Sequence, residues 1–129
     1  MMSEEVLVSA GRYQDKRGVI CDLMPFWIEE GINAVTFISS VKGSIRGNHY
    51  HKETTQWTYI TKGQTRVVHI IDGTLCDSIF GPGELITHRP GVPHAFEAIE
   101  DTEWLVFAKG PRAGDNYELD TFRLEIPLI

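Results

Sequence analysis

Residues 43–56 read Gly43-Ser44-Ile45-Arg46-Gly47-Asn48-His49-Tyr50-His51-Lys52-Glu53-Thr54-Thr55-Gln56. In a β-strand, side chains two residues apart project to the same face, so His49 and His51 present two imidazoles side by side. The five-residue step to Gln56 changes the strand parity, but a turn or bulge over residues 52–55 could bring its amide oxygen to the same face. This stretch therefore predicts a strand with a chelating pair of histidines, and Gln56 is available as a third ligand.

Outside this stretch, short apolar and β-branched runs recur along the chain. Turn signals separate them, such as Asp72-Gly73 and Gly81-Pro82-Gly83. The predicted strands are Gly18–Met24, Ile32–Val41, Gln56–Thr61, Gln64–Ile71, Thr74–Phe80, Glu84–Thr87, His94–Ile99 and Glu103–Ala108. Short strands at roughly ten-residue spacing, with nothing helical between them, indicate a sandwich or barrel rather than alternating strands and helices.

The composition agrees with an all-β protein. Isoleucine, valine and threonine number 32 against 14 for alanine and leucine, and β-branched side chains suit a sheet better than a helix. The longest run without glycine or proline is His94–Lys109, which leaves no room for a bundle of long helices. The length of 129 residues suits one domain, so residues 1–129 are taken as a single domain.

Charge and hydropathy exclude further classes of protein. Eighteen acidic residues against 12 basic ones give a net charge of −6, which opposes sequence-independent binding of nucleic-acid phosphates. No run approaches the roughly 20 apolar residues of a membrane span, and the N-terminus lacks a basic and a long apolar segment. We therefore expect a cytoplasmic protein in which Cys21 and Cys76 are free, buried thiols.

Two motifs resemble those of the cupin superfamily. The first has a glycine, five residues, His-x-His, three or four residues, a glutamate, six residues and a glycine. It falls on Gly43, His49, His51, Gln56 and Gly63. The second, a glycine followed by a proline and then a histidine four residues later, falls on Gly83, Pro90 and His94. Gln56 stands where most metal-binding cupins have glutamate, and Ala98 stands in place of a terminal asparagine.

This resemblance implies a double-stranded β-helix, a jelly-roll barrel whose mouth holds the site. In the metal-binding members, the equivalents of four residues bind iron, manganese, nickel or zinc. These residues are His49, His51, Gln56 and His94. Neutral imidazoles with an oxygen ligand suit those ions, and the spacing does not choose among them. The chain would then be a metal-dependent enzyme, either a dioxygenase or a metal-dependent isomerase.

A closer resemblance gives a metal-free alternative. The run from Arg46 to Gln56 is similar to the Arg-Gly-x-His-x-His-Lys-x-x-x-Gln signature of nucleotide-sugar 3,4-ketoisomerases, and to the Arg-Gly-x-His stretch of dTDP-4-keto-6-deoxyglucose 3,5-epimerases. In those enzymes the histidine that matches His49 takes a proton beside the sugar ketone, and the arginine that matches Arg46 holds the nucleotide diphosphate. The run Asp15-Lys16-Arg17-Gly18 is also similar to the start of related sugar-modifying cupin domains.

The residue types suit that chemistry. A base that removes a proton next to a carbonyl must be largely unprotonated yet strong enough near neutral pH, and histidine meets both conditions. His49 and His51 are therefore the candidate catalytic pair, one abstracting the proton and the other returning it. Tyr59 or Tyr50 is the candidate acid.

Arginine and tryptophan are the candidate substrate contacts. A chain of net charge −6 needs a local cluster of arginines to hold a diphosphate, and Arg46, Arg66 and Arg89 lie near the motifs. Trp57 could line the mouth and stack on a sugar or base. A non-catalytic cupin that binds a small ligand remains a third alternative to the two enzyme classes.

The remaining features are given structural roles. His69 is expected to be a partly buried strand residue with one hydrogen bond, and His88 is expected near a loop. The segment Tyr117–Ile129 alternates apolar with charged residues, which predicts an edge strand or a segment lying across a sheet or a partner subunit. Such an edge suits a homodimer.

Overall fold

The computed structural model describes residues 5–8, 13–20, 31–111 and 118–129, with residues 5–8 described by their backbone. Nearly all of this part of the chain is strand or turn. The strands are β1 (Glu5–Val8), β2 (Tyr13–Asp15), β3 (Gly18–Ile20), β4 (Ala34–Ser40), β5 (Ile45–Tyr50), β6 (Thr55–Lys62), β7 (Thr65–Ile71), β8 (Thr74–Phe80), β9 (Glu84–His88), β10 (His94–Ala98), β11 (Thr102–Lys109) and β12 (Phe122–Arg123). Within the described residues, no helix is long and apolar enough to cross a membrane.

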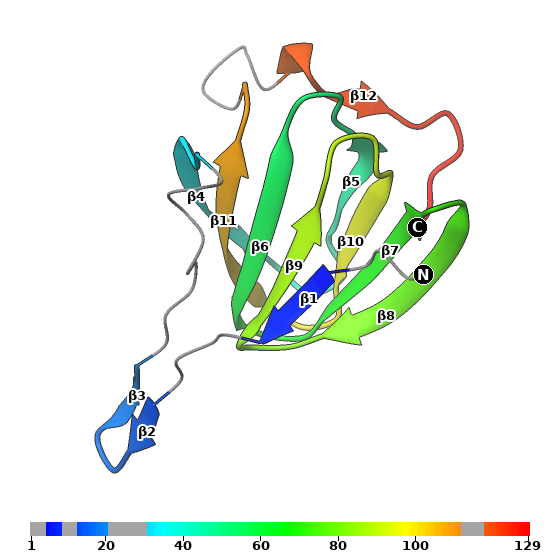
Figure 1. Ribbon diagram of the computed structural model, residues 1–129. Coiled ribbons are helices and arrows are strands. Elements are labelled where there is room, and N and C mark those ends of the chain that lie inside the picture. The colour runs from blue at the N-terminus through cyan, green and yellow to red at the C-terminus, as the bar shows by residue number, and fades with distance from the viewer. Residues whose placement is uncertain (1–4, 9–12, 21–30, 112–117) are drawn as a thin grey trace.

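Two five-stranded antiparallel sheets face each other (Figure 1). One has the order β1-β9-β6-β11-β4, and the other has the order β12-β5-β10-β7-β8. Strands β2 and β3 form a separate hairpin, which Figure 1 shows projecting away from the two sheets. This arrangement confirms the predicted all-β fold, a jelly roll of the cupin type.

The predicted strands lie where the sequence placed them, although some ends differ. Seven of the eight predicted runs agree with an observed strand to within two residues at each end. The eighth, Gly18–Met24, contains β3, and its last four residues lie outside the described part of the chain. Strands β1 and β2 were not predicted, because strands of four and three residues are too short to show a hydrophobic period.

The core between the sheets is built from alternate, inward-facing residues of the strands. It consists of Ile60, Val67, Phe80, Ile86, Phe96, Trp104 and Val106. The indole Nε1 of Trp104 donates a hydrogen bond to Thr65 Oγ1 at 3.1 Å, so the one polar atom of this large ring is satisfied. Phe96, Trp104 and Val106 also line a cavity between the two sheets, so the core forms part of the wall of that cavity.

A bulge between β5 and β10 sets the register of the histidines. The pairing shifts between His94 and Ala95, opposite Gly47 and Asn48, which have φ angles of 89° and 55°. A Cβ atom on Gly47 would lie 2.8 Å from the carbonyl oxygen of His94, so only glycine allows the two strands to approach this closely. With this bulge, His49 pairs directly opposite His94.

The C-terminal segment forms the edge strand that the alternation predicted. Strand β12 pairs with β5, placing Phe122 opposite Tyr50. The side chain of Asn48 then holds the last residues, since its Oδ1 accepts hydrogen bonds from the amides of Leu128 at 2.7 Å and Ile129 at 3.3 Å. The thiol prediction is only partly tested. Cys76 is free but half-buried, and Cys21 lies outside the described residues.

Candidate functional site

A cavity of about 390 Å³ opens between the two sheets and gathers part of the predicted site. Apolar residues on its wall include Ile38, Phe96, Trp104 and Val106. Its polar lining consists of Arg46, His49, Gln56, Thr58, His94, Thr121 and Arg123. Gln56 reaches the cavity from β6 of the facing sheet, because the chain crosses between the sheets after His51.

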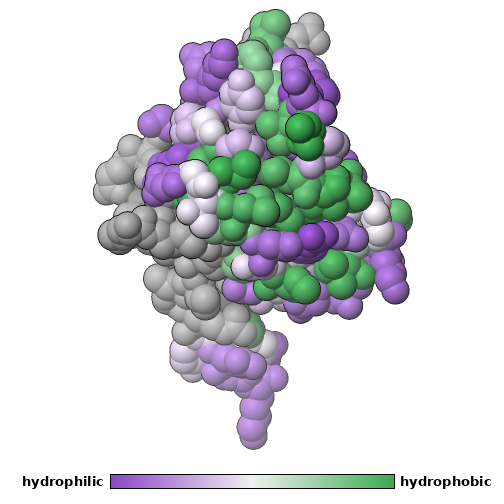
Figure 2. All heavy atoms as spheres, turned by 90° about the vertical axis from the view of Figure 1, so that its right-hand side faces the viewer, coloured by the Kyte–Doolittle hydropathy of each residue, from purple (hydrophilic) through white to green (hydrophobic). Residues whose placement is uncertain are grey.

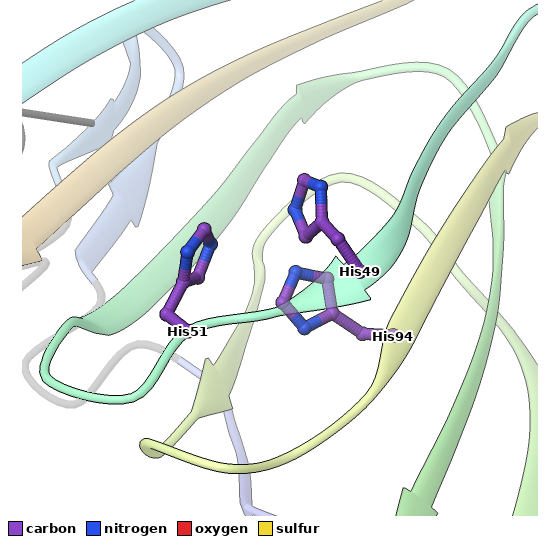
Figure 3. A group of neighbouring side chains, drawn as sticks. All are labelled: His49, His51 and His94. Atoms are coloured by element: carbon purple, nitrogen blue, oxygen red, sulfur yellow. The ribbon is translucent and has the colours of Figure 1, made fainter. Parts of the chain in front are cut away.

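Three histidines meet beside this cavity, and two of them, His49 and His94, line it. His49 lies near the end of β5, His51 follows that strand, and His94 begins β10 (Figure 3). One ring nitrogen from each lies within 4.8 Å of those of the other two. The ring centroids of His49 and His51 are 4.8 Å apart, and those of His49 and His94 are 4.9 Å apart. The structure thus brings together the histidines that both motifs contributed.

Backbone carbonyls select the tautomers of two of these rings. Nδ1 of His51 lies 2.9 Å from the carbonyl oxygen of Asp120, and Nδ1 of His94 lies 3.0 Å from that of Val92. Since a carbonyl oxygen can only accept a hydrogen bond, both Nδ1 atoms carry the proton. Each Nε2 therefore keeps its lone pair, and each can take up a proton or bind a metal ion.

Burial keeps His94 neutral. Its side chain is 1% exposed, and loss of solvent lowers the pKa of His94 to about 3, helped by repulsion from a charged His49. Among the described residues, its Nε2 atom has no hydrogen-bond partner. His94 therefore presents an uncharged nitrogen lone pair at neutral pH.

The loop after His51 is held by one carboxylate. Asp120 accepts hydrogen bonds from the amides of Lys52 at 3.0 Å, Glu53 at 3.1 Å and Thr54 at 2.9 Å, and from Thr54 Oγ1 at 2.7 Å. Burial alone would raise the pKa of the Asp120 carboxyl group, but the hydrogen bonds from Thr54, Lys52 and Glu53 together lower it. Through its side chain and its carbonyl oxygen, Asp120 fixes both the loop and the His51 ring.

Replacing Asp120 with alanine is expected to lower the free energy of unfolding by about 2–4 kcal/mol, because three backbone N–H groups and a buried hydroxyl lose their acceptor. Urea denaturation measures this change. Asp101→Ala is the matched control, since Asp101 is an exposed carboxylate that accepts a hydrogen bond from the Lys42 amide. A loss for Asp120→Ala no larger than that of the control would show that this carboxylate does not hold the loop.

Several predicted site residues do not line the cavity. His51 is one of them and is 3% exposed, although its ring centroid lies 4.8 Å from that of His49. Gln56 and Thr58 of β6 face inward, so strand parity turns Trp57 and Tyr59 to the outer face of the sheet, where they are 3% and 9% exposed and pack with Leu85. The expected roles of Tyr59 as acid and of Trp57 as stacking platform therefore find no support in the geometry.

Arg66 also lies away from the cavity. Its guanidinium is bound by Asp77 at 2.8 and 2.9 Å and by Glu97 at 3.1 Å, and those hydrogen bonds raise the pKa of Arg66. The guanidinium of Arg89 lies 5.7 Å from the ring centroid of Trp57, also away from the cavity. Of the predicted arginines, the structure brings only Arg46 to the cavity lining.

Arg123 is a cavity residue that the sequence analysis missed. It lies on β12 directly opposite His49, and Glu118 binds its guanidinium at 3.1 and 3.2 Å. The alternating pattern of the C-terminal segment predicted the edge strand but carried no signal of which strand it would join. The position of Arg123 follows only from that long-range pairing.

The expectation for His69 was wrong about its burial, whereas His88 lies next to a loop as expected. His69 is fully buried rather than partly buried, and His88 is the last residue of β9 and is 2% exposed. Nδ1 of His69 lies 2.8 Å from Nε2 of His88, and the His88 ring stacks on His94 with centroids 4.5 Å apart and planes inclined by 11°. All five histidines of the chain therefore form one continuous cluster.

The fold and the motifs have clear relatives. A family model described as cupin matches residues 24–119. QdtA, a sugar 3,4-ketoisomerase from Thermoanaerobacterium thermosaccharolyticum in complex with TDP, is 21% identical over 95% of this chain and 88% of its own, with a TM-score of 0.77. WlaRA, a TDP-fucose-3,4-ketoisomerase from Campylobacter jejuni, is 16% identical over 94% of this chain and 89% of its own, with a TM-score of 0.73.

A dTDP-4-dehydrorhamnose 3,5-epimerase from Sulfolobus tokodaii is also similar. It is 20% identical over 84% of this chain and 76% of its own, with a TM-score of 0.68. No curated protein sequence matches the chain significantly. At these identities the solved structures establish the shared jelly-roll fold, and the family model covers most of the sequence. The chain therefore belongs to the cupin family.

Proposed function

We propose that this cupin is an isomerase or epimerase that acts on a nucleotide-linked keto-sugar by moving a proton between carbon and a histidine. The observation that carries the proposal is the convergence, in one cavity, of the imidazoles of His49 and His94 with two arginines, Arg46 and Arg123. An imidazole suits proton removal next to a ketone, and arginines suit a diphosphate. The solved neighbours described as 3,4-ketoisomerases and 3,5-epimerases support the same class of substrate.

His49 is the proposed base. It is half-buried, lines the cavity and lies next to His51, whose Nε2 carries a lone pair. His49 removes the proton from the carbon beside the ketone, the C–H electron pair forms a carbon–carbon double bond, and the ketone oxygen takes a proton from water, which gives an enediol. For a ketoisomerase, the neighbouring hydroxyl then returns a proton to water and becomes the new ketone, while the former ketone carbon receives the proton held by His49, directly or after its transfer to His51.

Arg46 is the proposed anchor for the diphosphate. Its Nε donates a hydrogen bond to Ser40 Oγ at 2.7 Å, and its Nη2 donates one to the Ser39 carbonyl oxygen at 3.0 Å. These contacts fix the plane of the guanidinium at the cavity wall. A fixed, planar donor group loses little entropy when it binds a phosphate oxygen.

Proton exchange in heavy water tests the proposal. The protein, treated with a chelator, is incubated with dTDP-4-keto-6-deoxyglucose in D₂O, and NMR follows deuterium entry beside the ketone and the position of the ketone. Deuterium entry faster than in a protein-free control supports the proposal. No exchange with this or with UDP- and GDP-linked keto-sugars would overturn it, and dTDP binding without exchange would favour the non-catalytic alternative.

The histidine geometry also favours a second candidate, a metal-dependent cupin. His49, His51 and His94, with the amide oxygen of Gln56, would hold an iron, manganese, nickel or zinc ion. The Nε2 atoms of His51 and His94 carry no proton, as metal ligands require, and the nitrogen and oxygen donors suit these ions. A bound ion would act as a Lewis acid on a substrate oxygen.

Elemental analysis separates the two candidates, because a nitrogen that binds a metal cannot also take up a proton. Near-stoichiometric metal in the purified protein, lost in His94→Ala, would support the metal site and argue against His49 as a free base. Metal-free protein that still catalyses the exchange would exclude the metal-dependent candidate.

The protein is further proposed to form a homodimer. The hairpin β2–β3 exposes Tyr13, Val19 and Ile20, although a hairpin alone is only marginally stable in water. Figure 2 views the molecule from the side of β7 and β8 and shows hydrophobic residues gathered around a hydrophilic band. Leu75 and Ile79 of β8 are 62% and 58% exposed, which suits burial against a second copy.

Size-exclusion chromatography with light scattering measures the molar mass of the protein in solution and so tests for the dimer. A molar mass of twice that of the chain is expected for the wild type, and Leu75→Glu combined with Ile79→Glu is expected to reduce it to that of a monomer. Val41→Glu, at an exposed apolar residue outside the strands, is the matched control. A monomeric wild type would contradict the proposal.

A further inference from the structure

We propose that His69 and His88 form a positioning pair that holds the ring of His94 with its Nε2 lone pair toward the cavity. Neither residue belongs to the sequence motifs, and neither lines the cavity. They act through His94, so the proposal goes beyond either candidate function.

The strand pairing places the pair directly behind the site. His94 lies opposite His49 on one side and opposite His69 on the other, and residues paired in this way share a face of the sheet. His88 comes from the facing sheet, where it pairs with Gln56. His49, His94 and His69 thus lie side by side on the inner face of one sheet. They meet His88 and Gln56, which lie side by side on the other sheet.

Two contacts fix the orientation of His94. The Nδ1 atom donates a hydrogen bond to the Val92 carbonyl oxygen at 3.0 Å, and one ring face stacks on His88 at 4.5 Å between centroids. The stack blocks rotation of the His94 ring about its Cβ–Cγ bond. Such a rotation would turn the Nε2 edge of the ring away from the cavity. His69 in turn holds His88 through the 2.8 Å contact between Nδ1 of His69 and Nε2 of His88.

Hydrogen bonding also assigns the tautomer of His88. Its Nδ1 atom is buried, and among the described residues it has no hydrogen-bond partner. A buried acceptor without a partner is less unfavourable than a buried N–H without one, so Nδ1 carries the lone pair and Nε2 donates to His69. The stacked rings are then opposite tautomers, Nε2–H in His88 and Nδ1–H in His94.

Packing alone does not require these two imidazoles. Both lie in the interior, where His88 contacts the core residue Phe96 with ring centroids 5.6 Å apart. An apolar pair of the same size would avoid the buried nitrogen atom of His88 that has no hydrogen-bond partner. A fold that keeps a costly polar pair beside its site points to a positioning role.

Nitrogen NMR of the imidazole rings tests the proposal without any substrate, so its outcome is independent of the proposed function. In the wild type, His94 is expected as a single Nδ1–H tautomer and His88 as a single Nε2–H tautomer. In His88→Leu, the single-tautomer signature of His94 is expected to be lost, because its ring can turn and Nε2–H can form. In His69→Leu, His88 is expected to lose its single tautomer.

Two further variants separate positioning from packing. Val67→Ala removes buried volume from the same core without removing an imidazole, and it is expected to leave the His94 signals unchanged. Should His88→Leu fail to fold, His88→Gln keeps a donor for His69 but has no ring, and the same loss is expected. A folded His88→Leu or His88→Gln with unchanged His94 signals would overturn the proposal.

Discussion

Replacing His49 with glutamine is expected to slow proton exchange on the keto-sugar by about 100- to 10,000-fold, the range typical for loss of a general base. Glutamine has nearly the volume of histidine and can form hydrogen bonds, but its amide is far too weak a base to take a proton from carbon. Because His49 lines the cavity at the end of β5, the substitution leaves the sheets intact. The rate of deuterium entry in D₂O measures the effect.

Two further measurements show whether the slower exchange comes from loss of the base. The dTDP affinity of His49→Gln should stay within about threefold of the wild type, which shows that folding and anchoring survive. Arg46→Gln should behave in the opposite way, raising KM more than it lowers kcat, because it removes a contact to the diphosphate rather than to the reacting carbon. An exchange rate in His49→Gln above a tenth of the wild-type rate would exclude His49 as the base.

Acid is expected to destabilise the protein well above the pH at which carboxylates titrate. The unfolded chain protonates His94 near pH 6.5, whereas burial holds the pKa of His94 in the folded protein at about 3. Between these values the unfolded state binds more protons, so stability is complete above pH 6.5 and falls as the pH drops. His94 alone contributes about 1.4 kcal/mol per pH unit, or about 4–5 kcal/mol over the whole interval.

Urea denaturation between about pH 4.5 and 7 in the presence of a chelator measures this loss. Burial, with repulsion from His94, also lowers the pKa of His88, so the wild-type slope should exceed that of one histidine. His94→Gln is the control, and its slope should be smaller by about 1.4 kcal/mol per pH unit. Equal slopes for the two proteins would mean that His94 protonates in the folded state.

The part of the site that depends on local spacing could be predicted from the sequence. His49 and His51 share a face because they are two residues apart, and the glycines and prolines around them set the turns. The same reasoning, carried further, would have placed Trp57 on the outer face, because its neighbour Gln56 faces inward. What the spacing could not show was the partner of each strand.

Pairing between distant strands explains the other differences. His88 and Arg123 reach the site only because β9 pairs with β6 and β12 pairs with β5. Arg66 faces away from the cavity because it forms an ion pair with Asp77 of the neighbouring strand. No local sequence pattern predicts that ion pair. Such contacts depend on which strands become neighbours, and a hydrophobic period of two residues carries no information about that choice.

The link between Asp120 and the loop after His51 bears on the order of folding. Its hydrogen bonds join residues that lie 66 to 68 positions apart in the chain. Closing so long a loop costs entropy that local turns do not, so this link is expected to form after the β-hairpins. Strands β11 and β4 pair across a similar separation, so the sheets and the loop after His51 are expected to close at the same late stage. We therefore expect His51 to become oriented only in a chain that has also closed its sheets.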